Sequence, residues 1–197
     1  MTENPRPAET EDSTVTLLKQ ELTRVESGMR FSRVLRSTAF ALVIVAAIAV
    51  LLATLLFPVL QIYGGSMSPT LCEGEVVVAV KTGSIRSGEL VAFYYGNKVL
   101  VKRCIGAAGD IIHIDAAGNV SVNGAPLDEP YLEERSLGTC DIELPYQVPD
   151  GRYFVMGDQR KTSIDSRNTL VGCVASEQIV GTIAFRIWPL SRFGAVR

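Results

Sequence analysis

The strongest constraint on this chain is an uncharged apolar run, TAFALVIVAAIAVLLATLLF, at residues 38–57. A helix of about 20 residues is long enough to cross a hydrocarbon core of ~30 Å, and Pro58 after the run ends such a helix. A cleaved secretory signal has a shorter apolar region nearer the N-terminus, and a core helix of a small domain is rarely apolar on every face. The sequence therefore predicts a retained transmembrane helix over 38–57.

The charges around this run predict its orientation. Arg24, Arg30, Arg33 and Arg36 lie in the segment directly before it, and no Lys or Arg follows it until Lys81. Cytoplasmic flanks of membrane spans carry the excess of Lys and Arg. We therefore expect residues 1–37 in the cytoplasm and residues 58–197 on the outer side of the cytoplasmic membrane.

The predicted cytoplasmic segment, 1–37, has two parts. Residues 1–14 are polar, acidic and proline-containing, which is typical of a disordered tail. Apolar residues then recur at spacings of three and four: Val15, Leu18, Leu22, Val25 and Met29. This periodicity predicts a short amphipathic helix close to the bilayer surface, in contact with membrane lipid.

Composition excludes several classes of function. Apolar residues make up 47% of the chain, but many of them lie in the single run, and the net charge of −2 disfavours nucleic-acid binding. His113 is the only histidine. A histidine-based zinc site is therefore not expected, and a Ser-His-Asp triad would have to use that one residue. We expect no metal and no cofactor.

The four cysteines leave two interpretations open. Cys72, Cys104, Cys140 and Cys173 are widely spaced, without a C-x-x-C pair. An extracytoplasmic domain permits one or two disulfides among them, whereas free cysteines would be small buried residues.

The chain after residue 58 has the pattern of a β protein. Short runs that are β-branched or alternate in polarity are separated by Gly, Asn and Asp. They lie at 75–80, 90–95, 98–105, 110–114, 119–124, 153–158 and 179–190. No long helical periodicity follows the apolar run, so the fold class predicted for 58–197 is mostly β.

Two short motifs suggest a serine activated by an amine. GGSMSPTL (64–71) places Ser66 on irregular, glycine-flanked backbone, where a hydroxyl can be exposed. VLVKRCIGAAGD (99–110) places Lys102 inside an apolar strand, on the face of Leu100 and Cys104 and opposite Arg103. Burial disfavours the charged form of a lysine and lowers its pKa. A neutral amine can then take a proton from a serine hydroxyl.

A third motif, VMGDQRKTSIDSR (155–167), supplies polar groups to support such a pair. Ser163 can hydrogen-bond an amine, and Asp165 and Arg167 can pair. Asp158 and Arg160 could join that ion pair. Taken singly, the three motifs are also explained by a plain loop, an edge-strand lysine and a solvated charged loop.

Together, and in this order behind a membrane span, the motifs resemble bacterial type I signal peptidases. The shared pattern is Gly-x-Ser-Met-x-Pro-Thr-Leu, then Lys-Arg-x-x-Gly-x-x-Gly-Asp, then Met-Gly-Asp-x-Arg-x-x-Ser-x-Asp-Ser-Arg, although Gln159 departs from the more usual asparagine. The resemblance runs from about Leu35 to Trp188. The single span is similar to the small Gram-positive type. It implies a β-rich peptidase domain over 58–197, with a smaller β subdomain at about 106–152.

The resemblance also implies an activity and its residues. Members of the family remove signal peptides from exported preproteins at the outer face of the membrane through an acyl-enzyme. Ser66 then matches the nucleophile, Lys102 the general base, and Ser163 the serine that orients the lysine; Asp165 and Arg167 match the supporting pair. The Ser66 N–H would be one oxyanion donor. Some members have a second donor hydroxyl where this chain has Gly64.

The resemblance further implies shallow apolar pockets for small residues at the first and third positions before the cut. By their family positions, seven residues are expected to line these pockets: Leu60, Ile62, Met67, Leu71, Ala92, Leu100 and Val101.

Several other functions, with and without peptidase activity, share parts of this pattern. A conjugative pilin-maturation peptidase has a similar core, and the sequence does not separate it from a preprotein peptidase. A self-cleaving repressor would have a DNA-binding module and no span. A non-catalytic relative would lack the serine or lysine, and the histidine-using branch of signal peptidases would lack Lys102. The sequence predicts no oligomeric state.

Overall fold

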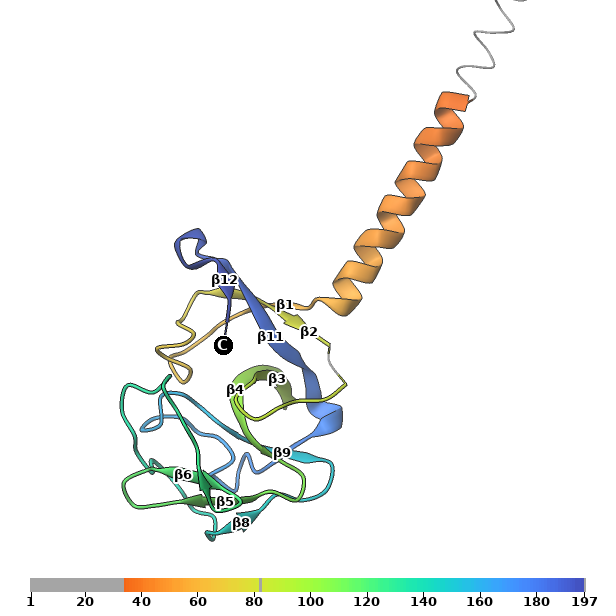
Figure 1. Ribbon diagram of the computed structural model, residues 1–197. Coiled ribbons are helices and arrows are strands. Elements are labelled where there is room, and N and C mark those ends of the chain that lie inside the picture. Colours follow the sequence, from red (N-terminus) through yellow and green to blue (C-terminus); the bar gives the residue numbers. More distant parts are fainter. Residues whose placement is uncertain (1–33, 82, 197) are drawn as a thin grey trace, which may run out of the picture. The chain divides into compact units, whose positions relative to one another are not determined.

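The computed structural model of the protein describes residues 34–81 and 83–196, and the chain forms two compact units, Met1–Leu52 and Ala53–Arg197. Within the described residues one helix, Val34–Leu56, is long and apolar enough to cross a membrane (Figure 1). It includes Arg36 and Ser37, which the predicted span of 38–57 left out, because helical backbone continues beyond the apolar run. The amphipathic helix expected at 15–29 lies outside the described residues.

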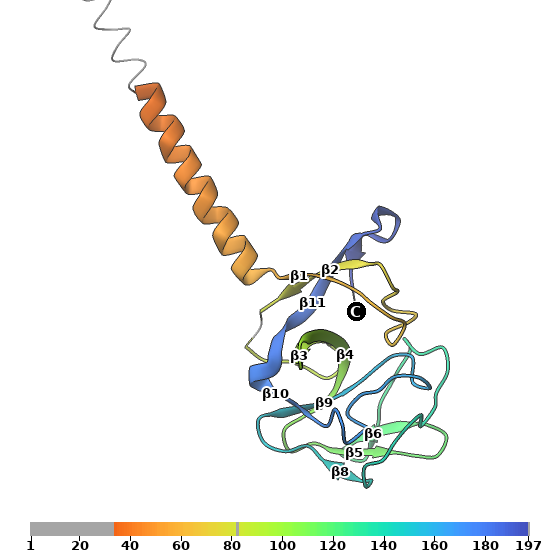
Figure 2. The same cartoon turned by 180° about the vertical axis from the view of Figure 1, so that it is seen from behind.

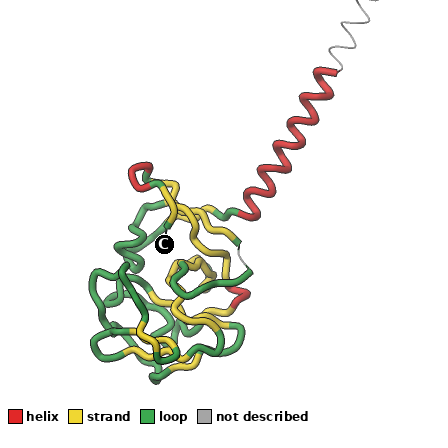
Figure 3. Tube along the Cα trace, viewed as in Figure 1, coloured by secondary structure: helices red, strands yellow, loops and turns green. Residues whose placement is uncertain are grey.

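Beyond the helix, the chain forms two antiparallel sheets (Figure 3). The larger sheet has the order β1 (Val59–Gln61), β2 (Val76–Val80), β11 (Ile179–Trp188), β3 (Leu90–Tyr95), β4 (Lys98–Ala107), β9 (Arg152–Met156) and β10 (Val174–Ala175), with β12 (Gly194–Ala195) paired to β11. The smaller sheet has the order β7 (Ala125–Pro126), β6 (Val120–Val122), β5 (Ile111–Ile114) and β8 (Tyr146–Gln147). Two 3₁₀ turns, η1 (Ser176–Gln178) and η2 (Leu190–Arg192), flank β11.

The mostly β prediction is confirmed, since all seven predicted runs contain a strand. The strands that the sequence did not predict, β1, β7, β8, β10 and β12, have only two or three residues each. Such segments are too short to show a period of two. Within the unit Ala53–Arg197, β1, β2 and β12 lie at one end and the smaller sheet at the other, and both views agree (Figures 1 and 2).

Strand alternation explains why both faces of β3 are buried. Leu90 and Ala92 belong to a core cluster that includes β2 and the segment after β1. Val91 and Phe93 belong to a second cluster, which Cys104 and β9 complete on the other face. A central strand covered on both faces reads as a continuous apolar run. A third cluster joins β4 and β9 to the smaller sheet.

Strand β4 has two halves with different surroundings. From Arg103 to Ala107 it pairs with β9, and residues Lys102–Gly106 are buried. From Lys98 to Lys102 it pairs with β3 on one side. No described strand pairs with the other side of this half, because the β9 register starts at Arg103. This unpaired edge of β4 ends at Lys102.

The four cysteines are free thiols in the structure. Cys104 is fully buried in the cluster of β3, β4 and β9, and its thiol donates to the Gly106 carbonyl oxygen at 3.7 Å. Burial raises the pKa of Cys104 to about 12. The sequence left open whether the cysteines form disulfides or stay free, and in the structure they are free.

Candidate active site

Ser66 lies on the loop between β1 and β2, and the ends of that loop are fastened together. Ile62 N–H donates to the Glu75 carbonyl at 2.8 Å, and Gly74 N–H donates back to the Ile62 carbonyl at 2.9 Å. Met67 and Leu71 anchor the loop in the core, with exposures of 2% and 0%. Ser66 itself is half-buried, so its hydroxyl sits on a loop that is tethered rather than free.

Lys102 is at the point where β4 begins to pair with β9. It faces Val91 of β3, and 3% of its surface is exposed. Burial lowers the pKa of Lys102 from 10.5 to about 8; the charge of Arg167 lowers it further, whereas Asp165 and Asp158 oppose the shift. A buried ammonium is costly in a medium of low dielectric constant. A substantial fraction of Lys102 is therefore neutral near pH 7 to 8.

Ser163 is the direct partner of this lysine. Lys102 Nζ donates to Ser163 Oγ at 2.9 Å, and Ser163 is 2% exposed. Ser163 lies on the loop after β9, where its N–H donates to the Gln159 carbonyl at 3.0 Å. This hydrogen bond uses one N–H of the Lys102 amine and thereby fixes the orientation of the amine.

Asp165 and Arg167 form a buried ion pair beneath Ser163. Arg167 Nη2 lies 2.8 Å from Asp165 Oδ2, and Nε lies 2.8 Å from Oδ1, so the pair is bidentate. Burial alone would raise the pKa of the Asp165 carboxyl, but Arg167, the Gly157 N–H and the Ser163 hydroxyl stabilise its charge and hold its pKa below the ordinary value. The pair therefore stays charged and rigid at neutral pH.

The loop between β1 and β2, which carries Ser66, and the loop after β9, which carries Ser163, touch at Gly157. Gln159 N–H donates to the Ser66 carbonyl at 3.1 Å. A Cβ placed on Gly157 would lie 2.6 Å from both the Ser66 carbonyl oxygen and Ser163 Cβ, and would overlap Ser163 Oγ. The structure thus brings Ser66 and Ser163, the hydrogen-bond partner of Lys102, together at one glycine.

Gly157→Ala is therefore expected to separate these loops and to lower the activity by at least about 100-fold, because small displacements of reacting groups are this costly. The control is Gly83→Ala, whose added Cβ would meet nothing within 4 Å. Steady-state cleavage rates with circular dichroism of both variants would check this. A Gly157→Ala enzyme as active as Gly83→Ala would mean that the close approach is unimportant.

Asp158 and Arg160 do not join the Asp165–Arg167 pair, contrary to the sequence expectation. Arg103 holds Asp158 through two bonds of 2.9 and 2.7 Å, and Arg160 pairs with Glu129. The expectation considered neighbours in sequence, whereas the β4–β9 register places Arg103 opposite Met156. Three separate buried ion pairs result.

The Arg103–Asp158 pair also contacts the loop that carries Ser66. Thr70 Oγ1 donates to Asp158 Oδ2 at 2.5 Å, and Arg103 Nη2 lies 3.3 Å from the same hydroxyl. On its other face, Arg103 Cζ lies 3.8 Å from the centroid of the Tyr131 ring, a cation–π contact. Since Arg103 follows Lys102, this network links the position of Lys102 to that of the loop that carries Ser66.

Thr70→Val is expected to destabilise the protein by about 2 kcal/mol, since a hydrogen bond to a buried carboxylate is lost. The turnover rate is expected to fall with it, because the loop that carries Ser66 loses its tie to β4. Thr70→Ser keeps the hydroxyl and is the matched control. Melting temperature and kcat, measured together, test this; a Thr70→Val enzyme as stable and active as Thr70→Ser would remove the link.

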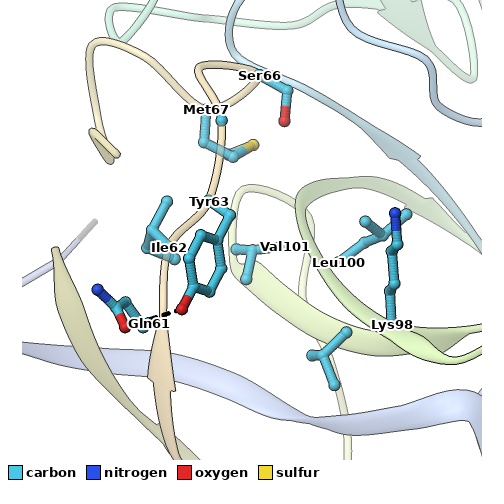
Figure 4. Close-up of a pocket in the computed structure, with 10 residues that line it drawn as sticks. Gln61, Ile62, Tyr63, Ser66, Met67, Lys98, Leu100 and Val101 are labelled. Atoms are coloured by element: carbon cyan, nitrogen blue, oxygen red, sulfur yellow. Dashed lines mark hydrogen bonds between the residues drawn. The ribbon is translucent and has the colours of Figure 1, made fainter. Parts of the chain in front are cut away.

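A pocket of about 560 Å³ opens beside Ser66 (Figure 4). Gln61, Ile62 and Tyr63 lie on one side, Lys98 and Leu100 on the other, and Ser66 and Met67 at one end. The full lining is Gln61, Ile62, Tyr63, Gly64, Ser66, Met67, Lys98, Val99, Leu100 and Val101. The Ser66 N–H donates to no acceptor in the described part of the chain and is free to meet a ligand.

Four of the seven residues expected to line substrate pockets do line this one: Ile62, Met67, Leu100 and Val101. The other three do not. Leu71 and Ala92 are fully buried in the core, and Leu60 packs against the same cluster. Ala92 faces inward because of strand alternation, and Leu71 turns inward to anchor its loop. Gln61, Tyr63, Lys98 and Val99 also line the pocket but were not predicted to do so, because the polarity of a side chain alone does not show that it faces a pocket.

Gly64 is placed where a side chain would be strained. Its φ is +79° and its missing Cβ would meet nothing within 4 Å, so glycine serves the backbone here. His113 is exposed on β5 of the smaller sheet and does not line the pocket. Among the described residues no cluster of three His, Cys, Asp or Glu side chains is arranged to hold a metal ion.

Comparisons with known proteins agree on one family. The family model described as signal peptidase, peptidase S26, matches residues 35–188. A signal peptidase I of Bacillus licheniformis is 35% identical over 164 residues, covering 77% of this chain and 87% of the relative. A signal peptidase IB of Staphylococcus aureus (strain COL) is 39% identical over 152 residues, covering 67% and 78%. A solved signal peptidase I of Enterococcus faecalis V583 matches with a TM-score of 0.42 and 25% identity, covering 52% of this chain and 98% of that one.

Proposed function

Because the chain belongs to the signal peptidase family, peptidase S26, we propose that it cleaves signal peptides from exported preproteins with Ser66 as nucleophile and Lys102 as general base. The observation that carries this proposal is the buried Lys102, whose pKa is lowered to about 8 and whose amine is bonded to Ser163 at 2.9 Å. Val101, the residue before Lys102, and Ser66 both line the same pocket.

In the proposed reaction, neutral Lys102 takes the proton of the Ser66 hydroxyl as Oγ attacks the scissile carbonyl carbon. The protonated lysine then gives this proton to the leaving amine, and the signal peptide remains as an ester on Ser66. Lys102 next takes a proton from a water molecule, whose oxygen attacks the ester, and returns this proton to Ser66 Oγ as the ester bond breaks and the signal peptide is released. Ser163 holds the amine in one orientation throughout.

The proposed oxyanion donor is the free N–H of Ser66. A donor of this kind contributes about 2.7–4 kcal/mol to transition-state stabilisation in other enzymes. Gly64 has no side chain to add a second donor.

The proposed substrates are preproteins with small residues before the cut. Ile62, Met67, Leu100 and Val101 give the pocket an apolar wall next to Ser66, which suits short side chains better than charged ones. The open edge of β4 from Lys98 to Lys102 offers backbone groups to an extended peptide. A bound peptide would then pass Ser66 in a fixed direction.

We further propose that residues 58–197 lie outside the cytoplasmic membrane. Arg36 is at the start of the apolar helix, Arg24, Arg30 and Arg33 precede it, and the segment after the helix has no Lys or Arg before Lys81. Protease added to spheroplasts should degrade a C-terminal epitope tag without lysis. A tag that is protected until lysis would reverse the orientation.

The function is tested with the full chain in mild detergent and a preprotein that carries Ala-x-Ala before its junction. We expect one cut after the second alanine, identified by the mass of both products. A matched preprotein with leucine in place of that alanine should remain intact. No cleavage, or equal cleavage of both, would contradict the proposal. Cleavage of a pilin precursor alone, among a panel of preproteins, would favour the conjugative type of peptidase.

A further inference from the structure

The lining of the pocket beside Ser66 contains one charged side chain, Lys98, which has no role in the proposed reaction. Lys98 is the first residue of β4, and its side chain is exposed. Figure 4 shows it on the wall opposite Gln61 and Tyr63. The nine other lining residues are apolar or neutral and polar. The pocket therefore has a positive end without a carboxylate in its lining.

The Lys98 ammonium makes no ion pair or hydrogen bond within the described residues. By contrast, the arginines around the base, Arg103, Arg160 and Arg167, are each paired with a buried carboxylate. Lys98 thus retains an unused charge that faces the space a substrate would occupy. A charge of this kind discriminates among ligands by the sign of what they bring to it.

The position of Lys98 relative to the reacting groups sets which substrate residue it meets. It is four residues from Lys102 on the same strand, and strand geometry makes this about 13 Å. An extended peptide beside β4 advances by nearly the same distance per residue. The apolar residues near Ser66 would receive the small side chains before the cut. Lys98 then lies beyond them, about four to six residues before the cut.

From this placement we propose that Lys98 is a specificity-determining residue, which favours preproteins with a carboxylate side chain four to six residues before the cut and disfavours those with a basic one. The proposal rests on the proposed function and deepens it by naming a substrate class. It assigns Lys98 no part in bond breaking.

The expected effect is moderate because the ammonium is exposed to solvent. Ion pairs at such sites change an equilibrium by up to about fivefold, and like charges do so in the opposite direction. The ratio of kcat/KM for a glutamate preprotein to that for a lysine preprotein should therefore be roughly tenfold in the wild type. It should shrink at high salt, since exposed pairs are screened.

The experiment compares preproteins that differ only in having Glu, Gln or Lys at the fourth, fifth or sixth position before the cut. Each is given to the full-length wild type, to Lys98→Gln and to Lys98→Glu in detergent. We expect the preference for Glu over Lys to disappear in Lys98→Gln and to reverse in Lys98→Glu at one of these positions. Arg135→Glu makes the same change of charge at an exposed residue outside the pocket and should keep the wild-type order.

The outcomes separate this inference from the proposed function. Equal cleavage of the Glu, Gln and Lys preproteins by the wild type, or an unchanged order in Lys98→Glu, would overturn the role of Lys98 and leave the peptidase activity standing. A reversal in Arg135→Glu would show a long-range charge effect and would also overturn it. Failure of the wild type to cleave any of the preproteins would instead contradict the proposed function, and the inference with it.

Discussion

Lys102→Ala and Ser66→Ala are each expected to lower kcat/KM for preprotein cleavage by at least about 1,000-fold, because the two residues act as one unit. Without Lys102, the amine that is bonded to Ser163 at 2.9 Å and that takes the serine proton in the proposed reaction is lost. Without Ser66, the pocket keeps its shape but has no hydroxyl at its end. The double variant should be no worse than either single one.

Three controls accompany this measurement. Circular dichroism should show that both variants retain the β-rich fold. His113→Ala should be fully active, since His113 is exposed on β5 and does not line the pocket. Lys81→Ala removes an exposed lysine outside that lining and should also be active. A Lys102→Ala enzyme with more than a tenth of the wild-type rate, by contrast, would mean that another base serves Ser66.

Lys102→Met is expected to make the protein more stable at pH 7, by about 2 kcal/mol. The pKa of Lys102 falls from 10.5 in the unfolded chain to about 8 in the folded one. Each pKa unit corresponds to about 1.4 kcal/mol. The cost of burying the amine is therefore about 3 kcal/mol, from which the lost hydrogen bond to Ser163 subtracts about 1 kcal/mol.

The sign of the pH dependence follows from proton binding. Between pH 8 and 10.5 the unfolded chain binds more protons at Lys102 than the folded chain, so the free energy of unfolding of the wild type rises with pH. Lys102→Met lacks this rise. Its advantage over the wild type should thus be full below pH 8 and should be lost as the pH rises to 10.5, above which the missing hydrogen bond leaves the variant about 1 kcal/mol less stable.

Denaturant unfolding of the full chain in mild detergent would measure this, followed through the fluorescence of Trp188, the only tryptophan. Lys98→Met is the matched control, because Lys98 is exposed and its removal should leave the stability nearly unchanged at every pH. A Lys102→Met variant that is less stable than the wild type at pH 7 would show that the amine is not buried at a cost.

Long strands and the apolar helix were predictable from sequence because their signals are local and repeated. β3 and β11 each show their pattern within their own residues. The pairing of Asp165 with Arg167 was likewise suggested by residues two positions apart. Where a signal lies within one segment, the sequence alone is enough.

The partners of Asp158 and Arg160 were not predictable, because they come from distant segments. Arg103 reaches Asp158 through the β4–β9 register. Glu129 reaches Arg160 from the connection between β7 and β8 of the smaller sheet. A lone glutamate in a loop has no periodicity to mark it. Which side chains line the pocket depended in the same way on how the loop after β1 turns, which put Leu71 inside and Tyr63 at the pocket.

Buried ion pairs around the site indicate which loops the fold must hold in position. Four ion pairs are buried among the described residues, and three of them lie around the site: Arg103–Asp158, Arg160–Glu129 and Arg167–Asp165. Replacing such pairs by apolar side chains is often neutral or stabilising in other proteins. We infer that their benefit here is geometric, since two of the three bond directly to Thr70 or to the Ser163 carbonyl.

The dependence of wild-type kcat/KM on pH, from 6 to 10, tests the role of a neutral Lys102 most directly. With a pKa of about 8, about a tenth of the amine is neutral at pH 7. We expect kcat/KM to rise nearly tenfold per pH unit below pH 7 and to level off above pH 8 to 9. A rate that is independent of pH over this range, or one that levels off near pH 6.5 as for a histidine base, would contradict the account.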